Sequence, residues 1–123
     1  MLKVIYVGFG GFIGSILRYS LYFLTNNILG YTTPIATLLV NIIGCFLIGC
    51  VYQLFSAHLV VSENLRLFIM IGLLGGFTTF SAFSIDAFLL YQNSGKILAI
   101  AYAVLSITLS LLATLAGVWL IKS

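Results

Sequence analysis

Four long apolar runs, separated by short polar breaks, constrain the fold of this chain more than any other feature. The runs cover residues 4–24, 33–55, 65–91 and 97–121. Each is long enough to cross a bilayer as a helix, which takes about 20 mostly apolar residues. The strict alternation of a membrane β-strand is absent. The pattern therefore predicts an all-α integral membrane protein, in which residues 1–123 form one domain of four transmembrane helices.

Composition excludes the main soluble classes. Hydrophobic residues make up 63% of the chain and charged residues 6%, against roughly 25% charged in an ordinary globular domain. So few charges cannot cover the surface of a small soluble domain. The basic residues are dispersed singly, which gives no phosphate-binding face. The one histidine, His58, is not accompanied by other residues that would form a catalytic group. We expect neither an enzyme nor a nucleic-acid-binding protein.

The charged residues carry little information on orientation. Four spans place Lys3, Arg66 and Lys122 on one side of the membrane and Arg18 and Lys96 on the other. Three against two is hardly the excess of basic residues that orients a membrane protein. Either the signal is weak because the protein is short, or the chain inserts both ways and pairs with an inverted copy of itself. Inverted symmetry is common in transporters, and the charges alone leave both interpretations open.

Polar residues within the first two runs allow both packing and functional interpretations. Gly10 and Gly14 form a small-xxx-small pair, which favours close helix packing. Arg18 either extends to the membrane interface or places a cation in the wall of an aqueous vestibule, where it attracts anions. Asn41, near the middle of the second run, either bonds a neighbouring helix or offers a donor to an anion in a pore.

The third run contains poor helix formers at mid-span. Glycines at 75–76 and threonines at 78–79 predict a break in this helix, with exposed backbone carbonyls. Phe77, Phe80 and Phe83 recur every three residues around the same segment. Such a stripe usually packs against lipid or core, but phenylalanine edges are electropositive and can also receive an anion.

Hydroxyl groups recur every four residues along the fourth run, at Tyr102, Ser106, Ser110 and Thr114. On a helix of 3.6 residues per turn they form a slowly winding polar track. Serine and threonine can also donate to the carbonyl four residues back, so a purely local role stays open. Asp86, at the end of the third-run motif, is equally compatible with pairing, capping or handling an ion.

Three segments carry a resemblance to a known family: GGFIG at 10–14 with Arg18 and Tyr19, TLLVNIIG at 37–44 and GGFTTFSAFS at 75–84. The chain resembles the Fluc (CrcB-type) fluoride ion channel family over essentially its full length, and the third segment is the most specific. The resemblance implies four-helix subunits that assemble as antiparallel, dual-topology homodimers in the cell inner membrane. It also implies two parallel pores that passively export cytoplasmic fluoride.

The resemblance assigns roles to individual residues. It implies that fluoride passes along the pore residues Asn41, Phe80, Phe83, Ser81, Tyr102, Ser106, Ser110 and Thr114. Arg18 corresponds to a vestibule arginine. Backbone carbonyls of Gly75 and Thr78 from both subunits are implied to hold a structural sodium ion at the two-fold axis.

Two positions depart from the family pattern. Alanine occupies position 82, where threonine is usual, and this removes a hydroxyl that we expect beside the pore, with weaker conduction as a result. Asp86 replaces an expected glutamate, so its shorter side chain reaches less far. The main rival function is a proton-coupled small multidrug exporter, which would need a buried carboxylate in the first span, where this chain has Arg18. A non-transporting assembly subunit would show no ion flux.

Overall fold

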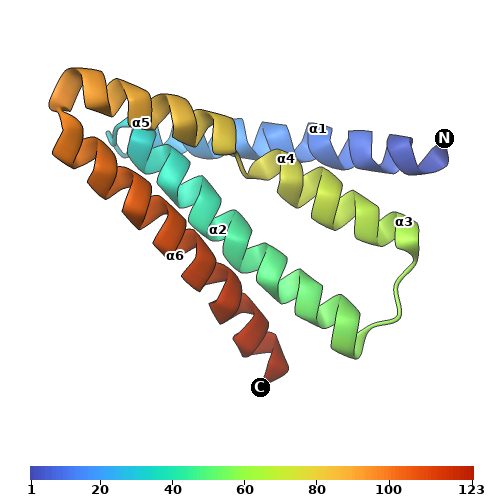
Figure 1. Cartoon of the computed structure of the whole chain (residues 1–123). Helices are drawn as coiled ribbons and strands as arrows, with labels where there is room; N and C mark the ends of the chain where they lie inside the picture. Colours follow the sequence, from blue (N-terminus) through green and yellow to red (C-terminus); the bar gives the residue numbers. More distant parts are fainter.

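The computed structural model describes residues 1–123 and contains only helices, arranged as four long spans (Figure 1). The first two spans consist of α1 (Leu2–Phe23) with the π-helical turn η1 (Leu24–Ile28), and α2 (Thr33–Gln53) with η2 (Leu54–His58). The third comprises α3 (Glu63–Arg66), η3 (Leu67–Leu74), α4 (Gly75–Phe77) and α5 (Phe80–Ser94). The fourth is the single helix α6 (Lys96–Lys122).

The ends of these spans follow from local chemistry. Pro34 lies in the first turn of α2, where a missing N–H costs nothing. Ser62 caps α3 by accepting a hydrogen bond from the Leu65 N–H at 3.2 Å. Gly95 joins α5 to α6 with a positive φ of 96°, a conformation that favours glycine. The four predicted spans are confirmed, with their limits shifted by a few residues.

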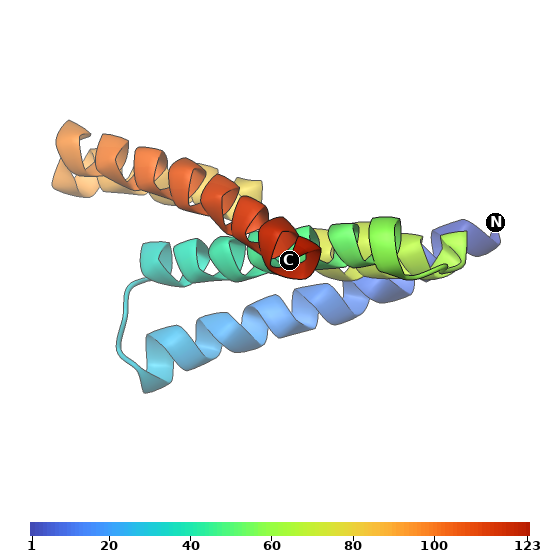
Figure 2. The ribbon, with the colours of Figure 1, turned by 90° about the horizontal axis from the view of Figure 1, so that it is seen from below.

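Helix α2 lies at the centre of the bundle. It packs along α6, while α1 packs against η3 and α4, and α5 packs against α6 and α2. In Figure 1 the C-terminal half of α1 appears directly behind α5, but the perpendicular view in Figure 2 shows α2 between them. The C-terminal half of α1 thus diverges from the α5–α6 pair.

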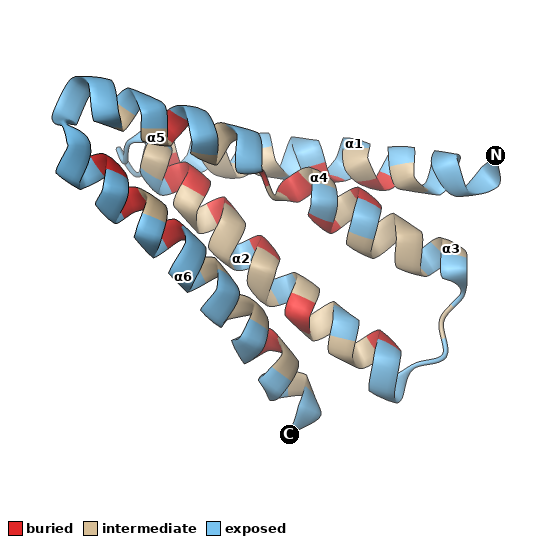
Figure 3. Ribbon diagram, viewed as in Figure 1, coloured by how far each residue is buried: buried red, intermediate tan, exposed pale blue.

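The outer surface of the bundle is apolar. Buried residues are few and lie mainly along α2 and the faces turned toward it (Figure 3), whereas large side chains such as Phe12 and Trp119 are 65% and 70% exposed. All four spans are long and apolar enough to cross a membrane. Since a soluble monomer rarely exposes such a continuous apolar surface, these features define a multi-pass membrane protein.

Glycines bring α1 and the first half of the third span into backbone contact. A Cβ added to Gly10 would lie 2.9 Å from the Gly72 Cα, and one added to Gly76 would lie 2.7 Å from the Gly11 carbonyl oxygen. A Cβ on Gly14 would collide with the Leu73 carbonyl. The predicted packing role of Gly10 and Gly14 is confirmed.

The third span is broken where the sequence predicts, but over a shorter stretch. Gly75 and Gly76 remain helical, and only Thr78 and Thr79 are extended, with ψ of 157° and 116°. Gly76 lies directly against Gly11 of α1, an approach that a side chain would prevent. The break also divides the phenylalanine stripe, because Phe77 lies before it, buried against Gly44, while Phe80 and Phe83 follow it on α5.

Candidate functional site

Asn41 pairs with the backbone of the break. Its side-chain amide donates to the Thr79 carbonyl at 3.0 Å, and its side-chain oxygen accepts from the Thr79 N–H at 2.8 Å. Both polar groups of an extended residue at membrane depth are therefore satisfied, as the absence of water requires. The carboxamide has a second N–H that this pairing does not use. Asn41 thus forms the interhelical bond that the sequence allowed and retains one donor.

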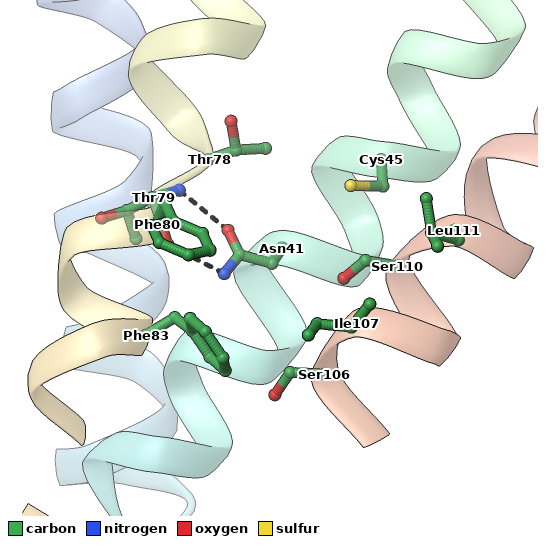
Figure 4. Close-up of a pocket in the computed structure, with 10 residues that line it drawn as sticks. All are labelled: Asn41, Cys45, Thr78, Thr79, Phe80, Phe83, Ser106, Ile107, Ser110 and Leu111. Carbon is green, nitrogen blue, oxygen red and sulfur yellow. Dashed lines mark hydrogen bonds between the residues drawn. The ribbon is translucent and has the colours of Figure 1, made fainter. Parts of the chain in front are cut away.

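A cavity of about 260 Å³ lies beside this pair and is called the Asn41 cavity (Figure 4). Five of the predicted pore residues are distant in sequence but meet in its wall: Asn41, Phe80, Phe83, Ser106 and Ser110. Thr78, Thr79, Cys45, Ile107 and Leu111 complete the wall. No charged side chain contributes to it, so its polar character comes from one amide, hydroxyls and the backbone at the break.

The two phenylalanines of the Asn41 cavity pack obliquely on each other. The ring centroids of Phe80 and Phe83 are 5.2 Å apart with a 50° angle between the planes. Phe83 also contacts Tyr102 of α6, at a centroid distance of 5.6 Å. Phe80 is 77% exposed. Both rings line the cavity, and the edges of such rings carry the positive end of the quadrupole.

The four hydroxyls of α6 occupy different environments. Ser110 lines the Asn41 cavity together with Ser106, whose buried hydroxyl oxygen has no hydrogen-bond partner. The Tyr102 hydroxyl instead donates to the Asp86 carboxylate at 3.5 Å. Thr114 donates to the Ser110 carbonyl four residues back at 3.2 Å, which is the local role left open by the sequence. Helix α6 therefore supplies two hydroxyls to this cavity.

Arg18 and Ser81 line a second cavity, of about 480 Å³, called the Arg18 cavity. The Arg18 guanidinium has no carboxylate partner, and it donates one long bond of 3.4 Å to the Thr78 carbonyl. The Ser81 hydroxyl lies 3.2 Å from that of Thr79 and does not reach the α6 hydroxyls within the subunit. Ala82 also lines the Arg18 cavity. The hydroxyl that the family pattern would supply at position 82 is therefore missing there, rather than in the Asn41 cavity.

Asp86 lies inside the bundle at 5% exposure. It accepts hydrogen bonds from Thr37 at 2.5 Å and from Tyr102, and the Tyr22 hydroxyl lies 2.8 Å from that of Thr37. Tyr22 could not be connected with this group from its position in the chain, because a tyrosine near the end of a span is ordinary at a membrane interface.

The carbonyls of Gly75 and Thr78 have both lost their usual helical donors. The Thr79 N–H, which would bond Gly75 in a continuous helix, bonds Asn41 instead. The Ala82 N–H, which would bond Thr78, bonds the Thr79 hydroxyl. Gly75 is exposed and Thr78 is half-buried. The Gly75 oxygen has no donor, and the Thr78 oxygen keeps its second lone pair beside the 3.4 Å bond that it accepts from Arg18. Carbonyl oxygens of this kind are suitable ligands for a small hard cation, so the donor set fits the sodium site that the sequence resemblance implies.

The fold and the site together define a class of protein. The chain has four membrane-crossing spans, and three of them line an uncharged cavity with polar groups at a helix break, which is the arrangement of a channel or transporter for a small ion. Residues 5–118 match the family described as "CrcB-like protein, Camphor Resistance (CrcB)".

Curated relatives extend this match over the whole chain. The fluoride-specific ion channel FluC of Rhizobium leguminosarum bv. trifolii is 41% identical over 123 residues, which cover 100% of this chain and 98% of the relative. The proteins of the same name from Ruminiclostridium cellulolyticum and Leptospira interrogans are 41% and 39% identical, covering 100% and 98% of this chain and 95% of each relative. The chain belongs to the CrcB/FluC family of fluoride-specific ion channels, which are not enzymes, and the resemblance seen in the sequence is confirmed.

Proposed function

We propose that this chain is the subunit of a fluoride-selective passive channel that exports cytoplasmic fluoride through two pores of an antiparallel homodimer. The observation that carries the proposal is the Asn41 cavity, where an amide, two serine hydroxyls and two phenylalanine rings meet at the helix break. Membership of the family supports the choice of ion.

The chemistry of the Asn41 cavity suits a small, strongly hydrated anion. Fluoride gives up part of its water only where several donors replace it, and the unpaired hydroxyl of Ser106 and the second N–H of Asn41 supply such donors. Phenylalanine edges add weak electropositive contacts. Because no cation lines the cavity, the ion is not held too tightly to leave, and fast conduction requires ready exit.

Arg18 contributes from a distance. It lies in a separate cavity, without a carboxylate to neutralise it, so it raises the local concentration of anions without binding them at the constriction. A cell-negative potential then favours passive efflux by about 2.3 kcal/mol per 100 mV. No energy coupling is needed for export.

Pairing with an inverted copy agrees with two features of the subunit. The basic residues are almost balanced between the two sides of the membrane. Phe80 and Gly75, at the break, are exposed on the isolated subunit, where a second copy would cover them. In such a dimer the Gly75 and Thr78 carbonyls of both copies would hold a sodium ion at the two-fold axis.

A small multidrug-type exporter finds less support. Its proton-coupled mechanism needs an accessible buried carboxylate, whereas Asp86 is the only buried acidic residue and is bonded by Thr37 and Tyr102. Neither the Asn41 cavity nor the Arg18 cavity is lined by a carboxylate.

Fluoride efflux from liposomes tests the proposal. The purified full chain is reconstituted into liposomes loaded with potassium fluoride, valinomycin is added, and released fluoride is followed with a selective electrode. We expect rapid fluoride release and no chloride release from matched liposomes, with slower fluoride release after sodium is replaced by a large organic cation. Absence of fluoride release would refute the channel, equal chloride release would refute the selectivity, and indifference to sodium would refute the sodium site.

A further inference from the structure

A chain of hydrogen bonds connects all four spans at the level of Asp86. Tyr22 of α1, Thr37 of α2, Asp86 of α5 and Tyr102 of α6 each come from a different span. The hydroxyls of Tyr22 and Thr37 are 2.8 Å apart, Thr37 donates to the Asp86 carboxylate at 2.5 Å, and Tyr102 donates to the same carboxylate oxygen at 3.5 Å. Asp86 has no cation partner, so these hydroxyl groups alone satisfy it.

The direction of the first bond follows from the number of hydrogens. Thr37 has one hydroxyl hydrogen, and two acceptors compete for it: the Asp86 carboxylate and, at 3.2 Å, the Thr33 carbonyl. In either case Thr37 has no hydrogen left for Tyr22, so the Tyr22 hydroxyl donates and the Thr37 oxygen accepts the bond between them. A carboxylate is the stronger acceptor, and the bond donated by Tyr22 polarises the Thr37 hydroxyl and strengthens its bond to Asp86.

The position of Tyr22 makes this bond consequential. The C-terminal half of α1 diverges from α5, with α2 between them (Figure 2). Tyr22 of α1 is connected to α5 through two hydrogen bonds. It bonds Thr37, a fully buried residue of α2, and Thr37 bonds Asp86 of α5.

The same chain of bonds leads to the Asn41 cavity. Asp86 lies three residues after Phe83, so both side chains lie on one face of α5. Tyr102, which donates to Asp86, also packs against the Phe83 ring. The orientation of α5 on α6, and with it the placement of Phe83, therefore depends on how Asp86 is bonded.

We propose that Tyr22 is a positioning residue for fluoride conduction. Its hydroxyl orients Thr37 toward Asp86, and this holds α5 and its phenylalanines against α6. Tyr22 lines the Arg18 cavity and not the Asn41 cavity, so it does not touch the ion at the proposed constriction. The inference rests on the proposed function, since its effect is read as fluoride flux.

Fluoride efflux from liposomes that contain single variants tests the inference. We expect Tyr22→Phe to lower the initial rate about three- to tenfold, the effect of one hydrogen bond expressed as a rate. Tyr91→Phe is the matched control, because Tyr91 lies on α5, is 56% exposed and forms no hydrogen bond through its hydroxyl, and it should conduct like the unmodified protein. Thr37→Val should lower the rate as Tyr22→Phe does, whereas Thr37→Ser, which keeps the hydroxyl, should restore it.

The double variant separates positioning from general destabilisation. If Tyr22 acts through Thr37, Tyr22→Phe combined with Thr37→Val is no slower than Thr37→Val alone. Rates for Tyr22→Phe equal to those of Tyr91→Phe, or losses that multiply in the double variant, would overturn the inference. If Tyr22→Phe fails to assemble on size exclusion, equal rates for Thr37→Val and Thr37→Ser would overturn it. Unmodified protein that releases no fluoride would instead refute the proposed function, and the inference with it.

Discussion

The two halves of the third span are held to the bundle by different forces. Before the break, η3 and α4 contact α1 through glycines, so that backbone lies on backbone with almost no polar bonds. After the break, α5 is held by hydrogen bonds. At its start Asn41 bonds the Thr79 backbone. Further along, Thr37 and Tyr102 donate to Asp86. Close packing needs no water and leaves no free donors. Polar attachment keeps amide and hydroxyl groups at membrane depth, and there the ion path is proposed.

The largest effect is expected from disturbing the glycine contact. Gly76→Ala would place a Cβ 2.7 Å from the Gly11 carbonyl oxygen and 2.9 Å from its Cα, and backbone atoms cannot move aside as side chains do. We expect a loss of stability of about 1–3 kcal/mol or more, measured as a lower midpoint of thermal unfolding in detergent. Gly8→Ala is the control, because a Cβ there meets nothing within 4 Å. Similar midpoints for the two variants would show that the glycine contact does not hold the first half.

The next largest effect is expected at the polar attachment. Asn41→Asp keeps the acceptor for the Thr79 N–H but removes the donor to the Thr79 carbonyl, and it adds a negative charge to the wall of the Asn41 cavity. We expect fluoride efflux to fall by about tenfold or more, since an unpaired buried acceptor alone costs about 1–3 kcal/mol. Asn93→Asp, in the exposed last turn of α5, makes the same change of charge and should conduct normally. Normal efflux from Asn41→Asp would show that Asn41 neither holds α5 in place nor lines the ion path.

The smallest effect is expected at position 82. Ala82→Thr restores the hydroxyl that the family pattern leads one to expect, but this residue lines the Arg18 cavity and not the Asn41 cavity. We expect the efflux rate to change by about twofold or less, as is usual for a substitution outside the packed core and the site. A much larger gain in rate would mean that the Arg18 cavity is part of the constriction.

Much of the fold could be predicted from the sequence because the bilayer imposes a length and a polarity on each span. The four spans, the packing of Gly10 and Gly14 and the break at the threonines all follow from composition and local propensity. The helical state of Gly75 and Gly76 could not be predicted, because their low helix propensity indicates a break, whereas tertiary contacts such as that of Gly76 with Gly11 also decide the conformation. The phenylalanine stripe is divided for a different reason, since helical spacing does not continue across the break at Thr78 and Thr79.

The site could be predicted only in part, because contacts between distant segments decide which of the candidate residues meet. Residue types indicated Asn41, Phe80, Phe83, Ser106 and Ser110, and these meet in one cavity. Sequence spacing could not show that Tyr102 turns toward Asp86, that Thr114 bonds its own helix, or that Ser81 lies with Arg18. These differences arise from side-chain rotamers and from contacts between distant segments. Tyr22 carried no distinguishing signal at all.

The most direct test of the central claim, that the ion path runs along the polar attachment of the second half, is fluoride efflux from Phe80→Ile in liposomes. Isoleucine keeps an apolar side chain but has no electropositive edge. We predict that efflux falls to the level of protein-free liposomes while the protein elutes from size exclusion as the unmodified protein does. Phe88→Ile, on the same helix and outside the Asn41 cavity, should retain normal efflux. Normal efflux from Phe80→Ile would contradict the account, because the ion would then cross the protein elsewhere.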